Sequence, residues 1–172
     1  MGESVTTRVT TGKALNATAK EFMELLGGRA DLAPSNNTVM LGLGDMTLEN
    51  LQGRNLHFGV REYAMTAICN GLAAIMKLSV IYMMTHQLLE LIAAARGITN
   101  MVVLRPGDAE EANLVWAMAL DRNDVPVLLS LTQQNLAVFT ISLGWQANAR
   151  RGVHIVYQSA HKPEICLIAM TS

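Results

Sequence analysis

The chain has 172 residues, of which 51% are hydrophobic and 16% charged, so it is long and apolar enough to bury a core as one domain. A formal net charge of -1, without a run of lysine or arginine, argues against nucleic acid as a partner. No stretch of eighteen apolar residues lacks a charge or a turn, and no signal peptide precedes the first predicted helix, so we expect no membrane span and a cytoplasmic location.

The first predicted element is an amphipathic helix over residues 12–26, with Thr11 as its N-cap and Gly27 and Gly28 as its stop. Residues 29–33 then predict a short extended segment. The Pro-Ser-Asn-Asn run at residues 34–37 is typical of a loop, and residues 39–53 indicate an irregular connection.

A strand that runs directly into a helix follows at residues 53–73. Apolar residues alternate with other residues over residues 55–60, which predicts a buried strand. From Tyr63 onward they recur every three to four positions, so we expect a helix from residue 61. Arg61 and Glu62 therefore stand at the carboxyl end of a strand, which is where open α/β sheets bind their ligands.

The second half of the chain alternates strands with helices. The pattern predicts strands over residues 79–84, 101–104 and 126–132, and helices over residues 87–96 and 109–122, the second with Asp108 as its cap. The pattern of residues 137–149 does not distinguish a helix from a strand. Residues 152–158 and 164–170 predict two strands. Strands that alternate with helices predict an α/β fold with a mainly parallel sheet.

The stretch GRNLHFGVREYAMTAICNGLA, at residues 53–73, resembles the transketolase family, whose segment reads close to GRN-x-HFG-x-REHAM-x-AI-x-NG-x-A. The resemblance continues through LLGGRADLAPSNNT (residues 25–38), MVVLRPGDAEEA (101–112), LTQQNL (131–136) and the tail from residue 152. In that family these segments form the middle domain, which holds the aminopyrimidine ring of thiamine diphosphate.

The resemblance implies a three-layer α/β fold, a reduced form of the pyrimidine-binding domain. We expect this domain over residues 1–150. Residues 151–172 would be a remnant of the family's C-terminal domain, packed as strands on the same domain. The family's N-terminal domain, which binds the diphosphate and its metal, is expected to be missing.

Two internal segments of the family are absent from the sequence. Residues 70–73 run directly into residues 74–78, where the family has a strand that carries the aromatic residues stacked on the aminopyrimidine, so we expect one continuous helix over residues 61–76. Farther on, the family has two Thr-His pairs around an acidic, glycine-rich loop, whereas this chain has Thr85 and His86 only. From which pair His86 descends stays open.

The resemblance gives roles to three residues of the first half. Glu62 matches the glutamate that hydrogen-bonds the aminopyrimidine and favours its imino tautomer; its alternative role is a first-turn acid that answers the helix dipole. Asp31 matches an aspartate near the cofactor, and Ser35 matches a serine that contacts the sugar phosphate. A serine beside proline in a loop is equally an ordinary turn residue.

Two further candidates depart from the family or fall at a deletion. Gln133 stands where the family has arginine for the substrate phosphate, and glutamine cannot supply that charge. His86 could contact substrate, but we favour a loop or N-cap role where the deleted segment was closed.

No other group of residues indicates a reactive site. Cys69 and Cys166 lie far apart in apolar surroundings, so we expect buried free thiols rather than a disulfide. The histidines at 57, 154 and 161 have no partners at metal-ligand spacing, so no metal site is expected.

Two functions are compatible with the resemblance. The first is a thiamine-diphosphate-dependent transketolase subunit that moves a two-carbon ketol unit between sugar phosphates with a partner chain that carries the diphosphate domain. The second, which we favour, is a catalytically silent, shortened domain that forms a homo-oligomer and binds no cofactor alone. The stacking strand and the acidic loop are both lost at boundaries between secondary-structure elements, which favours this second function. Whether engineering or degeneration removed them stays open.

Overall fold

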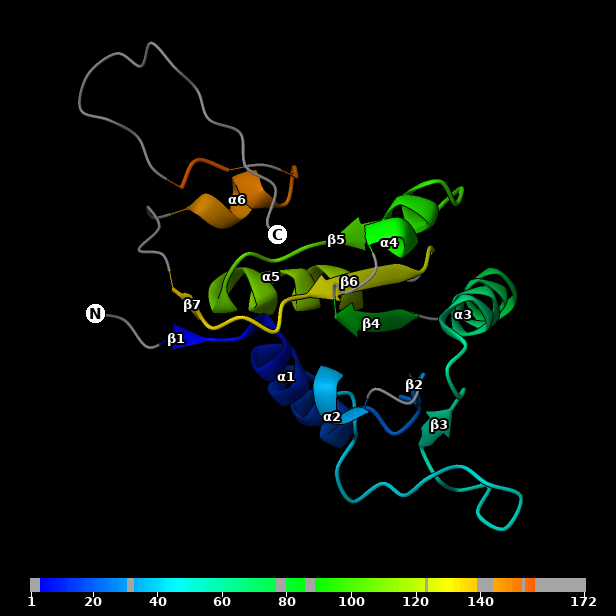
Figure 1. Ribbon diagram of the computed structural model, residues 1–172. Helices are drawn as coiled ribbons and strands as arrows, with labels where there is room; N and C mark the ends of the chain where they lie inside the picture. Colours follow the sequence, from blue (N-terminus) through cyan, green and yellow to red (C-terminus); the bar gives the residue numbers. More distant parts are fainter. Residues whose placement is uncertain are drawn as a thin grey trace, which may run out of the picture.

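A three-stranded parallel sheet lies at the centre of the computed structural model, which describes residues 4–30, 33–76, 80–85, 89–122, 124–138, 144–152 and 154–156. Its strands are β4 (Ile81–Thr85), β6 (Val127–Leu131) and β5 (Val102–Leu104), in that order. Four longer helices surround this sheet (Figure 1): α1 (Thr7–Glu21), α3 (Glu62–Met76), α4 (Leu89–Arg96) and α5 (Ala109–Leu120).

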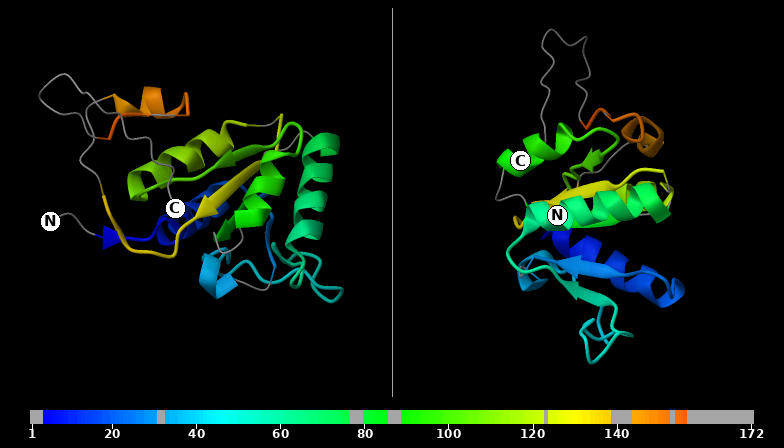
Figure 2. Two further views of the ribbon diagram at one scale, coloured as in Figure 1. Left: turned by 45° about the horizontal axis from the view of Figure 1, so that its top comes forward. Right: turned by 90° about the vertical axis from the view of Figure 1, so that its right-hand side faces the viewer.

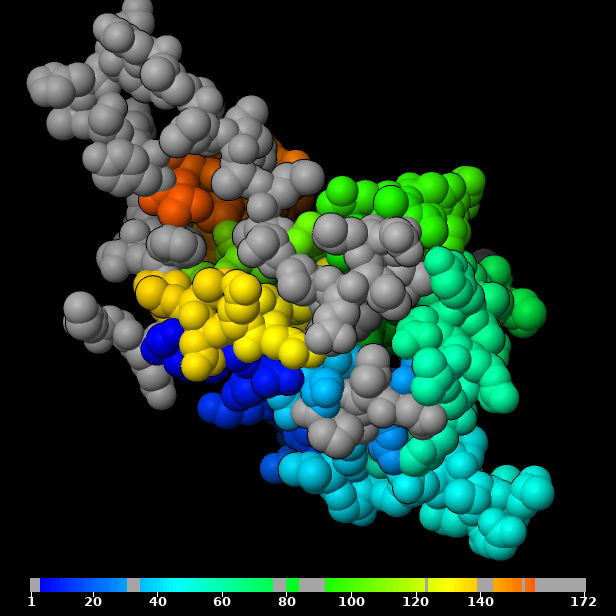
Figure 3. Space-filling model, in the orientation of Figure 1, coloured from blue at the N-terminus to red at the C-terminus, as the bar shows by residue number. Residues whose placement is uncertain are grey.

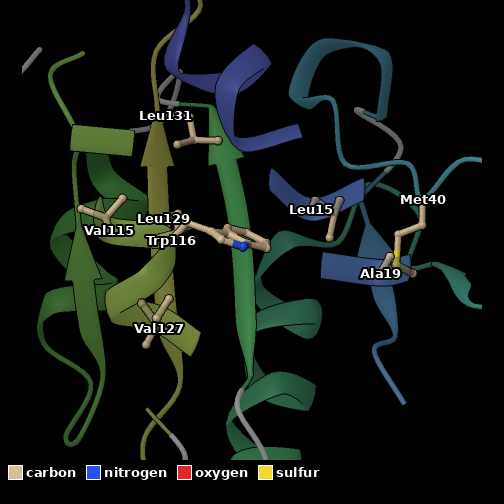
Figure 4. Close-up of a cluster of buried hydrophobic side chains, with 9 residues drawn as sticks. Leu15, Ala19, Met40, Val115, Trp116, Val127, Leu129 and Leu131 are labelled. Atoms are coloured by element: carbon tan, nitrogen blue, oxygen red, sulfur yellow. The ribbon is translucent and has the colours of Figure 1, made fainter. Parts of the chain in front are cut away.

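The layers can be followed from β6, whose five residues are all buried. Val127, Leu129 and Leu131 of β6 pack in one hydrophobic cluster with side chains of α1 and α5, and Trp116 of α5 belongs to this cluster (Figure 4). Leu128 of β6 points the opposite way and packs with Ile92 of α4, and Cys69 of α3 lies against the same group. A strand buried on both faces is typical of a parallel sheet between two helical layers, so the predicted three-layer α/β class is confirmed.

Two short strand pairs lie outside the central sheet. β2 (Gly27–Arg29) pairs in parallel with β3 (Asn55–His57), and β1 (Ser4–Val5) pairs antiparallel with β7 (Leu136–Ala137). β3 does not join the central sheet because the loop at residue 45 takes its other edge, where the Met46 N–H donates to the Asn55 carbonyl. The mainly parallel pairing is therefore confirmed, but it is divided among separate sheets.

Helix α1 begins earlier than predicted. Its N-cap is Thr6, whose hydroxyl accepts the Val9 N–H at 3.3 Å, while Thr11, the expected cap, lies buried inside the helix and donates to the Thr7 carbonyl. The first turn is fixed by a distant contact, because the Thr132 N–H donates to the Thr7 hydroxyl at 2.8 Å. Four threonines compete for the cap in the sequence, and the tertiary structure selects the first.

The same helix also ends earlier, at Glu21 rather than at residue 26. Arg54 donates to the carbonyls of Ala19, Phe22 and Leu25, which satisfies backbone acceptors at the end of α1. Gly27 and Gly28 consequently form strand β2 instead of a helix stop. Gly28 suits that strand because a Cβ there would lie 2.2 Å from the Phe58 ring.

Residues 33–36 form a helical turn, α2 (Ala33–Asn36), where a loop was predicted. The fixed φ of proline suits the first turn of a helix, so Pro34 does not prevent it. Strand β3 also ends at His57 instead of residue 60, because Gly59 turns the chain at φ 67°. Val60, predicted as a buried strand residue, is 77% exposed.

Helix α3 is continuous through Asn70 and Gly71, as the fused family segments predicted. Asp108 caps α5 as predicted, accepting the Glu111 N–H at 2.8 Å. The ambiguous region contains α6 (Trp145–Ala149). Residues 150–152 and 154–156 form turns and coil instead of the start of a strand, and residues 164–170 lie outside the described residues, so the domain division at residue 150 stays a prediction.

The continuity of α3 predicts the effect of replacing Gly71 by alanine. A Cβ at Gly71 meets nothing within 4 Å, and glycine inside a helix is less favourable than alanine, so Gly71→Ala should raise the free energy of unfolding by about 0.5–1 kcal/mol. Urea unfolding at low protein concentration measures this. Gly53→Ala is the control and should destabilise, because its Cβ would lie 2.1 Å from the Asp45 carbonyl oxygen. An unchanged or lower stability for Gly71→Ala would indicate a break in the helix.

None of the helices among the described residues is both long and apolar enough to cross a lipid bilayer.

Candidate functional site

Glu62 is the first residue of α3 and follows β3 after a tight turn. The turn is closed by the Arg61 N–H, which donates to the Gly59 carbonyl at 2.7 Å, and the Thr66 hydroxyl donates to the Glu62 carbonyl at 2.8 Å. The Glu62 side chain is half-buried, and its carboxylate has no hydrogen bond or ion pair within the described part of the chain. The structure thus places a free carboxylate at a helix N-terminus, which suits both roles considered for it.

The glycine, arginine and asparagine that precede this junction have structural roles. Gly53 allows the close approach of the Asp45 carbonyl, and Arg54 binds the end of α1. Asn55 is 3% exposed; its amide oxygen accepts the Met40 N–H at 2.9 Å, and its amide nitrogen donates to the carbonyls of Met40 and Gly44 at 3.0 Å. This part of the motif therefore fixes the loop at residues 40–45 and the end of α1, and none of its contacts reaches Glu62.

Ser35, in α2, lies against a residue that the sequence analysis did not consider. The Arg8 guanidinium donates from Nη1 to the Ser35 carbonyl at 2.5 Å, and its Nε is buried without a hydrogen-bond partner. The threonines at the start of α1 are the only sequence signal for this contact: a helix that begins at Thr7 has Arg8 in its first turn. A cation is therefore available beside Ser35.

Gln133 follows β6 at its carboxyl end and is half-buried. The residue before it, Thr132, is hydrogen-bonded to Thr7, which precedes Arg8. The structure thus brings the first turn of α1, the helical turn at Ser35 and the segment at Gln133 to one place. No hydrogen bond or ion pair connects Glu62 with Arg8 or Ser35 in the described ranges. Asp31 and His86 lie outside the described residues.

The described residues fit one part of thiamine diphosphate. The free, half-buried Glu62 carboxylate is the acceptor that an aminopyrimidine ring nitrogen needs. The nearby aromatic side chains are differently engaged: Phe58 lies against Gly28, Tyr63 is 68% exposed, and the Tyr82 hydroxyl donates to the Met101 sulfur. No group of three metal-ligating side chains occurs among the residues that the structure describes. The chain can therefore offer the ring contact, without a described site for the diphosphate and its metal.

Cys69 is a free thiol, as predicted, and it packs, partly buried, against the group that contains Leu128 and Ile92, while Cys166 lies outside the described residues. Burial raises the pKa of the Cys69 thiol to about 11, so it stays protonated at neutral pH. The prediction that Cys69 is a core residue and no nucleophile is consistent with this environment.

A cavity of about 240 Å³ lies between the edge of the central sheet and the ends of α5 and α6. Its floor is aliphatic, and the charged side chains at its rim are ion-paired with acids, Arg150 with Asp121 and Arg122 with Asp124, both at 3.3 Å. It is lined by no residue of the Glu62 or Ser35 regions.

Residues 3–85 match the family model described as transketolase, pyrimidine-binding domain. The transketolase of Geobacillus stearothermophilus is 34% identical over 212 residues, which include 99% of this chain and 32% of that protein. The solved transketolase of Leishmania mexicana superposes with a TM-score of 0.78 at 31% identity, covering 93% of this chain and 30% of that one. A chain described as split-gene transketolase, inactive β4 tetramer, shares the fold with a TM-score of 0.57 at 21% identity, over 80% of this chain and 54% of its own.

The chain spans about a third of the length of the curated relatives it matches. The matched region of the Geobacillus protein is nevertheless longer than this whole chain of 172 residues, by about 40 residues. The chain is therefore shortened relative to the matched region, as predicted, and the positions of the missing segments stay a prediction. The chain belongs to the transketolase family, and it carries a shortened form of that family's pyrimidine-binding domain.

Proposed function

We propose that this chain is a catalytically silent, cytoplasmic pyrimidine-domain module, shortened by design or by degeneration, that self-associates through one face of α3. The observation that carries the proposal is that face. It consists of five large apolar side chains with exposures between 43% and 84%: Val60, Tyr63, Ile68, Leu72 and Ile75, here called the α3 face. Figure 2 (right) shows α3 lying across the molecule with no element in front of it, and Figure 3 shows it at the molecular edge.

The α3 face is continuous along the helix. Val60 lies just before the helix, and the other four members lie with the exposed alanines at positions 64 and 67 on its outward half, while Met65, Thr66 and Ala73 are buried. No charged residue occurs from Tyr63 to Met76. Soluble monomers seldom expose a continuous apolar patch of this kind.

A second copy of the chain is the partner that we propose for this face. Burying the five side chains would remove roughly 600 Å² from each copy, or about 1,200 Å² in a dimer, which is at the lower end of specific interfaces. Glu62 is the only acid of α3, so an antiparallel pairing of the two helices keeps the two Glu62 carboxylates apart.

We propose that the chain alone is catalytically silent because it offers only some of the contacts that thiamine diphosphate, its metal and a sugar phosphate need. Glu62 can contact only the pyrimidine ring, the described residues offer no metal-ligand group, and Gln133 lacks the charge of an arginine. Orientation of a cofactor depends on all of its contacts together, so the loss of several removes more than their sum.

The alternative function is a thiamine-diphosphate-dependent transketolase subunit that works with a separate diphosphate-binding chain. Two observations favour it: the Glu62 carboxylate is free at the end of an exposed apolar face, and Arg8 places a guanidinium beside Ser35. In that case Glu62 would hold the pyrimidine ring, Arg8 and Ser35 would bind the sugar phosphate, and the cofactor would supply the carbanion-stabilising chemistry.

Isothermal titration with thiamine diphosphate and magnesium tests the proposal. The wild-type chain should bind more weakly than about 100 μM, with heats unchanged in Glu62→Ala. Glu49→Ala, which removes an exposed carboxylate from the loop before β3, is the matched control. Submicromolar binding that Glu62→Ala abolishes and Glu49→Ala retains would overturn the silent-module proposal in favour of the alternative.

A further inference from the structure

An ionic cluster lies at the carboxyl end of the β2–β3 pair. Arg29 and His57 are the last residues of the two strands and are directly paired in register. Asp45, from the loop that bridges to β3, approaches both: its Oδ1 lies 3.4 Å from Arg29 Nη2 and 2.9 Å from His57 Nε2. Arg29 Nη2 is also 2.5 Å from His57 Nε2. Among the described residues, Arg29 and Asp45 are the charged groups that face His57.

The two contacts of His57 require Nε2 in opposite states, a lone pair toward Arg29 and an N–H toward Asp45. A guanidinium only donates, so Nε2 can bind Arg29 only through its lone pair. A carboxylate only accepts, so Nε2 can bind Asp45 only when it carries a proton. One ring nitrogen cannot do both, and the three groups must therefore exist in two alternative pairings.

We propose that protonation of His57 transfers Asp45 from Arg29 to His57 and releases the Arg29 guanidinium. With His57 neutral and its hydrogen on Nδ1, the tautomer that the Arg29 contact requires, Arg29 donates to both Nε2 and Asp45. With His57 protonated, Nε2–H donates to Asp45, and the imidazolium repels the guanidinium 2.5 Å away. The Arg29 side chain is only 14% exposed in the paired arrangement, so its release transfers a shielded cation to solvent.

The pH range of the exchange and its place in the fold both follow from the residues. Histidine is the side chain that ordinarily changes charge near neutral pH. The hydrogen bond from His57, together with the charges of His57 and Arg29, holds the pKa of the Asp45 carboxyl below its usual value, so Asp45 stays ionised throughout. Arg29 lies two residues before Asp31 in the sequence, and β3 leads to Glu62, so the cluster stands on the two segments that lead to candidate residues.

NMR of the full ¹⁵N-labelled chain between pH 5 and 8 tests the exchange. The Arg29 Nε–Hε signal, assigned by its loss in Arg29→Lys, should shift with the same midpoint as the His57 imidazole. Its protection from a neutral gadolinium chelate should be lost below that midpoint. His57→Gln should abolish both changes, and His154→Gln, which alters a histidine paired with Glu111, should leave them unchanged.

The outcome does not depend on cofactor binding or catalysis. Amide spectra of each variant show whether it is folded, and Asp45→Asn offers a second variant if His57→Gln is not. In folded Asp45→Asn the carboxylate is lost, so the chemical shift of the Arg29 Nε–Hε signal should not change at the pH where His57 is half protonated. Protection of Arg29 that stays constant across the titration, or the same change in folded His57→Gln, would overturn the proposal.

Discussion

Replacing Ile68 and Ile75 together by lysine is expected to convert the proposed self-associated form into a monomer of 18.7 kDa. Both side chains belong to the α3 face, with exposures of 47% and 84%, and α3 carries no basic residue of its own. In an antiparallel pair the four new ammonium groups would be brought into a single apolar contact, where unpaired charges are strongly unfavourable. We expect the dissociation constant to rise by at least about 100-fold, which corresponds to roughly 3 kcal/mol.

Sedimentation velocity over a range of protein concentrations measures this change. Leu48→Lys is the matched control, because Leu48 is 92% exposed in the loop at residues 45–53 and outside the α3 face. It should leave the sedimentation coefficient of the wild type unchanged. A wild-type chain that stays monomeric at every concentration would reject self-association altogether, and an unchanged assembly in the double variant would place the interface elsewhere.

Asn55→Ala should destabilise the fold by about 2–3 kcal/mol, because it leaves buried backbone groups without partners. The Met40 N–H loses its acceptor, and Met40 is fully buried, so water cannot replace the amide. The carbonyls of Met40 and Gly44 lose a donor as well. Urea unfolding followed by circular dichroism measures the change in the free energy of unfolding.

Asn50→Ala is the control for that substitution. Asn50 is exposed in the same loop, and its amide donates to the Asp45 carbonyl at 3.1 Å, so its loss should cost no more than about 0.5 kcal/mol. Equal stabilities for the two variants would show that Asn55 does not hold the loop. The comparison also decides whether the asparagine of the family motif has a structural role, as its contacts indicate.

The exposed α3 face and the fused helix are connected features. The sequence predicts a deletion after residue 73, and α3 runs without interruption to Met76, just ahead of β4. The helix is therefore long enough to carry a full stripe of apolar side chains. Its inner side is buried at Met65 and Ala73, and its outer side is exposed.

Local patterns in the sequence determined the class of fold, the continuous helix α3 and the position of Glu62. Alternation and helical spacing depend on residues within one or two turns of each other, and so does the Asp108 cap, which binds a residue three positions away. The family motif added the expectation that the domain is shortened, which the length of the matched region confirms. These features were predicted because the interactions behind them are short in sequence.

The tertiary structure alone decided the ends of α1, the pairing of Arg8 with Ser35 and the Arg29–Asp45–His57 cluster. Thr7 and Thr132 are 125 residues apart, and Arg54 reaches carbonyls that precede it by 29 to 35 residues. Hydrogen bonds over such separations leave no periodic signal, so a cap chosen from neighbouring threonines was wrong. The exposure of α3 has the same origin, because its apolar stripe is compatible with burial until the rest of the fold leaves it uncovered.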